Sequence, residues 1–153
     1  MKKILSAVLA VLMIAMTFSI CSSAVGTTVE SSVEYFDDGS YTVTTITVEN
    51  SARAAKTTTG KKHKEYRSAS DELLWKVTVS GTFTYTGTTA TCTKSSTSSV
   101  IYNDDWKVTS AVASKSGNKA IGNFTVKRYL LGIPTATKET SVTLTCSAKG
   151  VLS

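Results

Sequence analysis

The clearest pattern in the chain is an alternation of apolar and polar residues between positions 73 and 92. A period of two places successive side chains on opposite faces of a strand, so this stretch predicts a long β-strand with one buried face. Thr86-Gly87 then offers a two-residue turn, and residues 88–92 can return antiparallel. This register pairs Phe83 with Ala90 and Gly81 with Cys92. The apolar positions are Trp75, Val77, Val79, Phe83 and Tyr85.

Similar alternation recurs between turn signals as far as the C-terminal residues. Asn103-Asp104-Asp105 and Ser116-Gly117-Asn118 predict turns, because Asn, Asp and Gly tolerate the backbone angles that turns require. A two-residue loop would set Val112 opposite Asn123, whereas three loop residues set it opposite Gly122, so we prefer the longer loop. The residues predicted to be buried together are Trp75, Val79, Phe83, Trp106, Val108, Phe124, Val126 and Leu144.

Residues 25–70 follow a different pattern. Residues 25–50 predict a β-hairpin around the turn Asp37-Asp38-Gly39-Ser40. Residues 51–70 lose the alternation and are small, polar and basic, which is typical of an exposed flexible loop or linker. The hairpin is therefore expected to be a separable arm that precedes the main body of the protein.

Together these elements predict an all-β fold. About seven strands at hairpin spacing, with no helical periodicity, favour an antiparallel β-sandwich over residues 71–153, preceded by the N-terminal hairpin. The spacing of Cys92, Trp106 and Cys146 is similar to that of immunoglobulin domains. Leu144 stands where those domains carry a tyrosine, so the likeness extends to an immunoglobulin-like architecture only.

Residues 1–24 have the composition of a secretory signal peptide. Lys2 and Lys3 precede an apolar run, and Ser22-Ser23-Ala24 supplies small residues for cleavage. Secretion with cleavage near Ala24 is therefore predicted. Two alternatives are lipidation of Cys21, which the bulky residue before it disfavours, and an uncleaved membrane anchor formed by the apolar run.

Cleavage would leave two cysteines, Cys92 and Cys146. An even pair in an exported chain favours a disulfide, and both residues fall on predicted inward faces. The alternative is a pair of buried free thiols.

Charge is unevenly distributed along the chain. Residues 25–50 contain acids and no base, whereas residues 51–67 contain six bases and one acid. Such a basic segment is a candidate binding site for a polyanion, or a solvated spacer that folds back onto Glu30, Glu34 and Glu49. The candidate polyanion-binding residues are Arg53, Lys56, Lys61, Lys62, Lys64 and Arg67.

Candidate catalytic chemistry is sparse. His63 is the one histidine and lies among lysines, which disfavour its charged form, so we interpret it as a solvated residue. The acidic pairs, such as Asp104-Asp105, are adjacent in sequence and point apart on a strand, whereas a glycosidase needs two carboxyls that face each other. We therefore predict no enzymatic activity, no cofactor and no metal.

The chain from residue 25 onward resembles small, uncharacterised secreted all-β proteins of Gram-positive gut bacteria. The resemblance rests on DGSYTVTTITVEN, Gly81-Thr82-Phe83-Thr84-Tyr85, Ser114-Lys115-Ser116-Gly117 and Val142-Thr143-Leu144-Thr145-Cys146. These are structural strings, and such proteins carry no established activity. The resemblance implies export and an all-β fold, and it implies no site.

Two function classes agree with these observations. The first is a binding or interaction module that recognises an anionic cell-wall polymer or glycan, or another protein, outside the cell. The second is a released effector, such as a bacteriocin-like toxin or a hydrolase inhibitor. Nucleic acid is disfavoured, because the basic segment contains only one aromatic residue, Tyr66, for base stacking.

Overall fold

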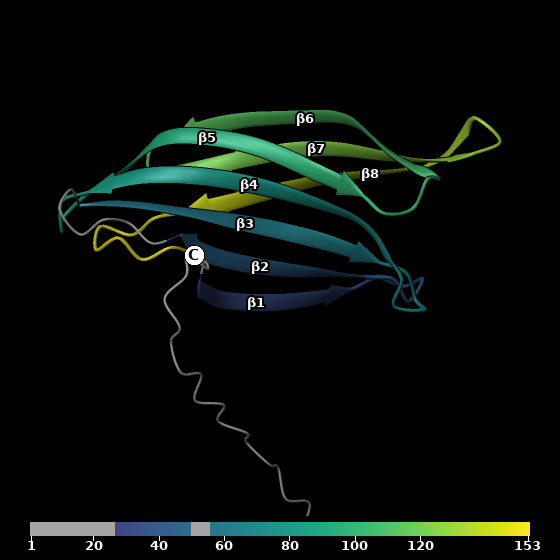
Figure 1. The fold of residues 1–153 in the computed structure, drawn as a ribbon, viewed down its shortest axis with the longest axis horizontal. Coiled ribbons are helices and arrows are strands. Elements are labelled where there is room, and N and C mark those ends of the chain that lie inside the picture. The colour runs from purple at the N-terminus through teal and green to yellow at the C-terminus, as the bar shows by residue number, and fades with distance from the viewer. Residues whose placement is uncertain (1–26, 50–55) are drawn as a thin grey trace, which may run out of the picture.

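The computed structural model describes residues 27–49 and 56–153 of the 153-residue chain. The predicted signal peptide (1–24), with Cys21, and Arg53 lie outside these residues. The described part contains eight β-strands and no helix (Figure 1). They are β1 (Thr27–Tyr35), β2 (Tyr41–Glu49), β3 (Thr57–Arg67), β4 (Leu73–Tyr85), β5 (Ala90–Ile101), β6 (Trp106–Ser116), β7 (Lys119–Leu130) and β8 (Ile133–Thr145).

The strands form two antiparallel sheets that pack face to face, so the predicted all-β sandwich is confirmed. Sheet A has the order β1-β2-β3-β4-β5, and sheet B has the order β6-β7-β8. Each strand pairs with its neighbour in sequence, so the fold is two successive meanders. Immunoglobulin domains differ in this respect, because their strands are joined by Greek-key connections.

The core lies between the two sheets. The inner faces of β4 and β7 supply side chains with no solvent exposure, including Val77, Val79, Phe83 and Val126. Seven of the eight residues predicted to be buried together belong to this cluster, and the eighth, Val108, packs half-buried against it. The prediction of the core is therefore confirmed, because period-two alternation assigns faces correctly once a strand is recognised.

The predicted linker over residues 51–70 is wrong for most of its length. Thr57–Arg67 forms β3, which pairs with β2 along one side and with β4 along the other. Hydrogen bonds between backbone groups hold such a strand in place whatever its side chains are. Because β2 continues sheet A through β3, the N-terminal hairpin is part of the sandwich rather than a separable arm.

Two of the predicted turn registers are also wrong. The loop between β4 and β5 spans Thr86 to Thr89, which sets Phe83 opposite Cys92, and the register then shifts between Phe83 and Thr82. Gly117-Asn118 forms a two-residue loop between β6 and β7, which pairs Val112 with Asn123. The register of β6 and β7 shifts between Val108 and Ser110. Val108 therefore lies opposite Val126 and points toward the core, even though Val112 pairs with Asn123.

The two sheets differ in width, and this difference creates a ledge. In sheet B, β7 packs over β4 and β5, while β8 packs over β3 and β4. Strands β1 and β2 therefore extend beyond β8, as Figure 1 shows along the lower side of the sandwich. Part of the inner face of sheet A is thus open beside the free edge of β8.

Candidate functional site

Strand β3 distributes the predicted polyanion-binding residues over two faces of sheet A. Lys61 pairs with Ser80 on the outer face, and Lys62 pairs with Val79 on the inner face. By the same alternation Lys64 points inward and Arg67 outward. The basic residues are therefore not a single patch, and only the inward pair faces the ledge beside β8.

Several of these cations already have acidic partners. The Lys61 ammonium lies 2.5 Å from a Glu49 carboxylate oxygen, and the Lys64 ammonium lies 3.6 Å from a Glu34 oxygen. The predicted contact between the basic segment and the acidic hairpin is confirmed for these two glutamates. Exposed ion pairs of this kind contribute only about 0–1 kcal/mol to stability. Each pairing reduces the positive charge that the lysine presents to an anionic ligand.

The remaining predicted cations lie at the two ends of β3. Lys56 donates a hydrogen bond to the Thr86 carbonyl, with 3.3 Å between the atoms. Arg67 is ion-paired on the outer face, at 3.2 Å from Glu65 and 3.1 Å from Asp71. These pairings hold the Arg67 pKa above its ordinary value, chiefly through the Glu65 hydrogen bond. Neither residue faces the ledge.

The open inner face of β1–β3 and the edge of β8 enclose a groove, here called the β8 cleft. Six of its seven lining residues are serine, threonine or lysine. Lys62 is half-buried and forms no ion pair among the described residues, and the Lys64 side chain is only 20% exposed. A cleft with these groups presents hydrogen-bond donors and positive charge to its contents. Its lining residues are Ser32, Thr44, Lys62, Lys64, Ser141, Val142 and Thr143.

Lys138, on β8, brings a third ammonium to the same region. Its Nζ lies 5.0 Å from the ring centroid of Phe36 and 5.3 Å from that of Tyr66. Within the described ranges it has no carboxylate partner. Sequence reasoning missed this residue, because no local pattern indicates that β8 lies beside β3.

A smaller cavity of about 200 Å³, here called the Thr42 pocket, lies beside the β8 cleft. Lys64 lines both the cleft and this pocket, so the two adjoin. Glu34, Phe36 and Glu139 also line it. The buried and half-buried residues of the pocket are Thr42, Lys64, Tyr66, Trp75, Lys138 and Thr140.

Two polar atoms of the Thr42 pocket residues lack hydrogen-bond partners. The Thr42 hydroxyl oxygen and the Trp75 indole nitrogen are both buried and unpaired in the structure. Thr42 and Trp75 are 3% and 2% exposed, so bulk water does not satisfy them. A buried polar group without a partner costs about 1–3 kcal/mol. A ligand or an enclosed water that paired with them would recover that cost.

A chain of hydrogen bonds fixes the hydroxyl end of the Tyr66 side chain. The Tyr66 hydroxyl donates to the Ser40 hydroxyl at 2.9 Å, and Ser40 donates in turn to the Asp38 carboxylate. Hydrogen bonds from Ser40 hold the pKa of Asp38 below its ordinary value. The Tyr66 ring stacks on Trp75 with 5.0 Å between centroids, so neither its hydroxyl nor that face is free for a ligand.

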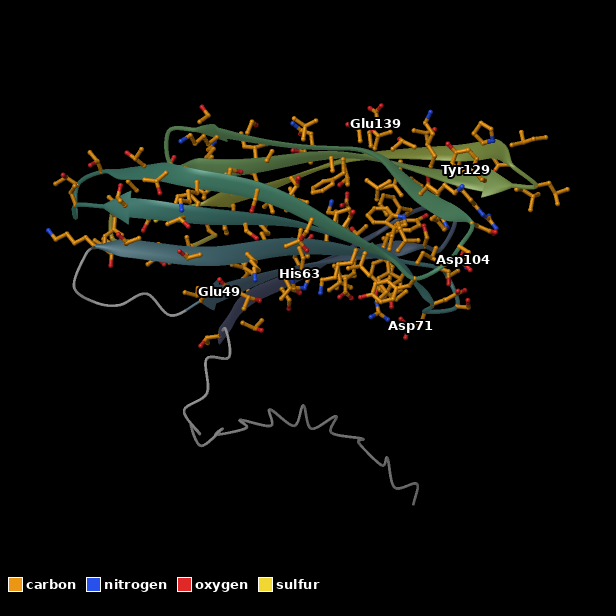
Figure 2. All side chains as sticks on the ribbon, turned by 45° about the horizontal axis from the view of Figure 1, so that its top comes forward. Glu49, His63, Asp71, Asp104, Tyr129 and Glu139 are labelled. Atoms are coloured by element: carbon orange, nitrogen blue, oxygen red, sulfur yellow. The ribbon has the colours of Figure 1, made fainter. Side chains whose placement is uncertain are left out.

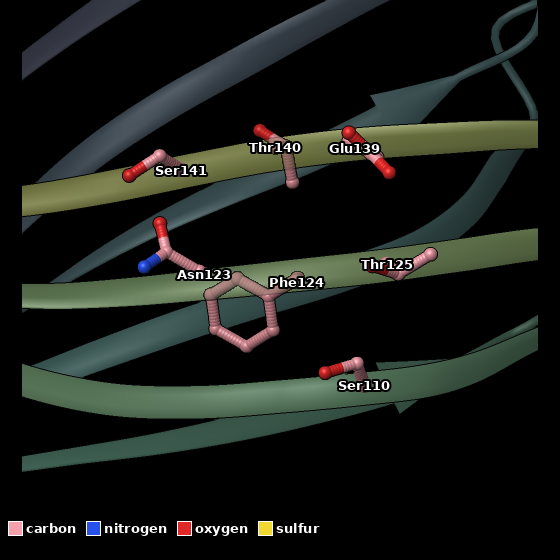
Figure 3. A pocket seen from close by; sticks show the side chains of 7 residues that line it. All are labelled: Ser110, Asn123, Phe124, Thr125, Glu139, Thr140 and Ser141. Carbon is pink, nitrogen blue, oxygen red and sulfur yellow. The ribbon is translucent and has the colours of Figure 1, made fainter.

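A different depression lies on the outer face of sheet B. Figure 3 shows side chains from three adjacent strands around it, among them Ser110, Asn123 and Glu139. Several of its lining residues, such as Asn123, are exposed to solvent. Phe124 is buried and turned toward the core, so the depression offers no apolar floor. This surface is a solvated sheet face, and we do not consider it the primary site.

The candidate catalytic residues do not converge in the structure. His63 lies on the outer face of sheet A, between Thr45 and Thr78. Burial, with a smaller contribution from Lys76, lowers its pKa, so it is neutral at pH 7. Figure 2 shows Glu49 and the pair Asp71 and Asp104 toward opposite ends of the sandwich. Within the described ranges no cluster of three His, Cys, Asp or Glu residues is suited to a metal ion.

The two cysteines approach each other at the β6–β7 turn. The Cys92 amide donates to the Gly117 carbonyl at 2.8 Å, and the Cys146 amide donates to the Asn118 carbonyl at 3.0 Å. Both are buried free thiols in the structure, so the predicted disulfide is not formed there. Burial raises the pKa of both thiols, and the nearby Cys92 raises that of Cys146 further.

Comparison of the chain with protein-family models, with curated proteins and with solved structures finds no match. Residues 27–49 and 56–153 contain no helix of the length and apolar character needed to cross a membrane. The β8 cleft with its Thr42 pocket is therefore assigned from its own geometry.

Proposed function

We propose that the protein is a secreted, non-enzymatic binding module, and that its β8 cleft binds an anionic polymer, namely an acidic glycan at a cell surface. One observation carries this proposal. Lys62 and Lys64 line the β8 cleft, Lys64 and Lys138 line the adjoining Thr42 pocket, and neither Lys62 nor Lys138 forms an ion pair among the described residues. Partly buried cations bind anions more strongly than exposed ones do, because water screens them less.

The shape of the cleft also supports an extended ligand. It runs beside the free edge of β8 and over the open inner face of β1–β3, and it continues into the Thr42 pocket through Lys64. Exposed Ser32 and half-buried Thr44 and Thr143 line it with hydroxyls that can donate and accept hydrogen bonds. Hydroxyls and ammonium groups together suit the ring hydroxyls and acidic groups of a polysaccharide.

Binding to acidic polysaccharides tests the proposal. The measurement is isothermal titration of the purified chain with an acidic polysaccharide and with a neutral one, at low and high salt. Replacing Lys62, Lys64 and Lys138 with Gln should weaken acidic-polysaccharide binding by about tenfold or more, since each lost contact to an anion is charge-assisted.

The matched control removes the same charge elsewhere. Lys94, Lys119 and Lys149 are exposed and lie away from the cleft, and their replacement with Gln should leave binding nearly unchanged. Equal weakening by both triple variants would mean that net charge, and not the cleft, attracts the polymer. Absence of binding to every acidic polysaccharide would remove the proposal, and growth inhibition of neighbouring bacteria would then favour the released-effector alternative.

Secretion is part of the same proposal and has a consequence for the cysteines. The backbone amides of Cys92 and Cys146 donate hydrogen bonds to the consecutive residues Gly117 and Asn118 of one turn. In an oxidising compartment the two thiols would be joined by a disulfide. Each thiol loses its proton, the S–S bond forms, and a disulfide oxidant accepts the two electrons. A bridge closing about 54 residues contributes about 4 kcal/mol in the chain-entropy description. Intact mass after alkylation without reductant tests it, and two alkylated thiols in the exported protein would exclude the bridge.

A further inference from the structure

The Thr42 pocket contains groups that a solvated cleft does not explain. The Trp75 indole N–H can only donate a hydrogen bond, and it has no acceptor in the structure. The Thr42 hydroxyl is also unpaired, and the two ammonium groups of Lys64 and Lys138 line the same cavity. Four residues that carry hydrogen-bond donors therefore line one small cavity, and an occupant that paired with Trp75 and the two lysines would have to supply acceptor atoms.

Stacking against an aromatic ring is not available to this occupant. Tyr66 and Trp75 are stacked on each other, with an angle of 16° between their planes. The Lys138 ammonium lies over the rings of both Phe36 and Tyr66. The pocket therefore recognises its occupant through hydrogen bonds and charge rather than through a flat apolar face.

The charges of the lining limit the charge of the occupant. Lys64 and Lys138 bring two positive charges, and Glu34 and Glu139 bring two negative ones to the same pocket. The two carboxylates repel a dianion such as a phosphate monoester more strongly than they repel a group with a single negative charge.

The size of the pocket limits the occupant further. At about 200 Å³ it is smaller than the roughly 300–1,000 Å³ of cavities that enclose drug-sized ligands. It can hold the end of a ligand while the rest lies in the β8 cleft. A phosphodiester is a single negative charge with chain on both sides, so it does not fit a closed end. A carboxylate is singly charged and terminal.

We propose that the Thr42 pocket receives the carboxylate of an acidic sugar unit, with Trp75 and Thr42 donating hydrogen bonds to its oxygens and Lys64 and Lys138 balancing its charge. This inference rests on the proposed function, since it identifies the acidic group of the polymer in the β8 cleft. The polymer is accordingly a polyuronate or another carboxylated polysaccharide rather than a phosphate-linked one.

The test compares three probes on the purified chain by isothermal titration: an oligo-uronate, its neutral methyl ester, and poly(glycerol phosphate). The unchanged protein should bind the oligo-uronate most tightly. Thr42→Val keeps the shape of the side chain and removes only the unpaired hydroxyl, and Trp75→Phe removes the indole N–H. Each should weaken oligo-uronate binding about tenfold, because each removes a hydrogen bond to a charged group. Neither should change binding of poly(glycerol phosphate).

Controls separate this inference from loss of folding and from the proposed function. Thr78→Val changes a half-buried threonine on the outer face of sheet A and should leave binding unchanged. Thr42→Val should fold normally, since the hydroxyl it removes has no partner in the structure.

Three results would overturn the inference. Equal binding of the ester and the oligo-uronate would do so, and so would unchanged uronate affinity in Thr42→Val, which would mean that enclosed water alone satisfies the pocket. If poly(glycerol phosphate) bound as tightly and depended only on the three cleft lysines, the inference would fail while the proposed function stood. If no anionic probe bound, both would fail.

Discussion

Lys138 and Tyr66 contact each other across the two sheets, with the Lys138 ammonium 5.3 Å from the centre of the Tyr66 ring. Lys138 lies on β8 of sheet B, and Tyr66 lies on β3 of sheet A. The contact joins the edge of one sheet to the open face of the other, at the point where the Thr42 pocket meets the ledge. It therefore places a cation in the candidate site and also contributes to the packing of the sandwich.

Replacing Lys138 with Met tests the structural part of this role. Met keeps a long apolar stem and removes the charge, so the packing remains while the cation–π contacts with Phe36 and Tyr66 are lost. The free energy of unfolding should fall by about 0.5–1 kcal/mol. Urea denaturation measures it, and Lys138→Arg is the control that should retain stability. Equal loss in both variants would show that the contact depends on side-chain shape and not on charge.

The centre of the core is tested at Phe83. Its side chain has no solvent exposure and lies between the sheets. Phe83→Ala should lower the free energy of unfolding by about 3–5 kcal/mol, through lost burial and the cavity left behind. Phe36→Ala, at a ring that is 36% exposed, should cost clearly less. A loss below about 1 kcal/mol at Phe83 would mean that the buried face of β4 is assigned incorrectly.

The pairing of β3 on both sides predicts slow amide exchange, whereas a flexible linker would exchange rapidly. The backbones of Lys62 and Lys64 lie between β2 and β4, so their amides should exchange with solvent as slowly as those of β4. Hydrogen–deuterium exchange read by mass spectrometry measures this. Trypsin should accordingly cut at these lysines only when the sandwich unfolds. Rapid exchange or early cleavage there would restore the linker interpretation.

Hydrogen bonds to the carboxylates of Asp38 and Asp71 predict that the free energy of unfolding depends on pH in the acid range. Hydrogen bonds from Ser40 lower the pKa of Asp38, and the Tyr41 hydroxyl, followed by Arg67, lowers that of Asp71. Folding therefore favours the ionised carboxylates, and the unfolded chain binds more protons at acid pH. This stabilisation is present above the ordinary aspartate pKa of 3.8 and is lost as the pH falls through the lower folded values.

Urea denaturation across the acid range tests this assignment. Asp38→Asn should flatten the fall in stability, whereas Asp104→Asn, in an exposed turn, should leave the profile unchanged. An unaltered profile in Asp38→Asn would contradict the role of Ser40 in holding that carboxylate ionised.

The sequence predicted the strands whose side chains alternate, and missed the one whose side chains do not. On β4 the inner positions are apolar because sheet B covers them, so the period of two is visible. On β3 the inner positions include Gly60, Lys62 and Lys64, because the cover by sheet B ends there. Lysine stems can line such a half-covered face while their ammonium groups reach solvent. The resulting composition is that of a loop.

Gly60 gives a second reason why the sequence pattern did not predict strand β3. A Cβ at this position would lie 2.3 Å from a methyl carbon of Leu152 and 2.8 Å from the Thr47 carbonyl oxygen. The glycine is required because the C-terminal segment packs against β3, a contact between residues far apart in the sequence. The same holds for Lys138 and the Thr42 pocket, which exist only because β8 lies above β3 in the folded chain. Local patterns carry no information about such a contact.

We expect the β8 cleft, and no other surface of the protein, to bind the acidic polymer. The most direct measurement is a two-dimensional NMR titration of the labelled protein with an oligo-uronate. Shift changes should be confined to the cleft and the Thr42 pocket, with the Trp75 indole N–H signal among the largest because it gains an acceptor. Changes centred instead on Asn123 and Ser110 of sheet B, or on Lys61 and Arg67 of the outer face of sheet A, would contradict the claim.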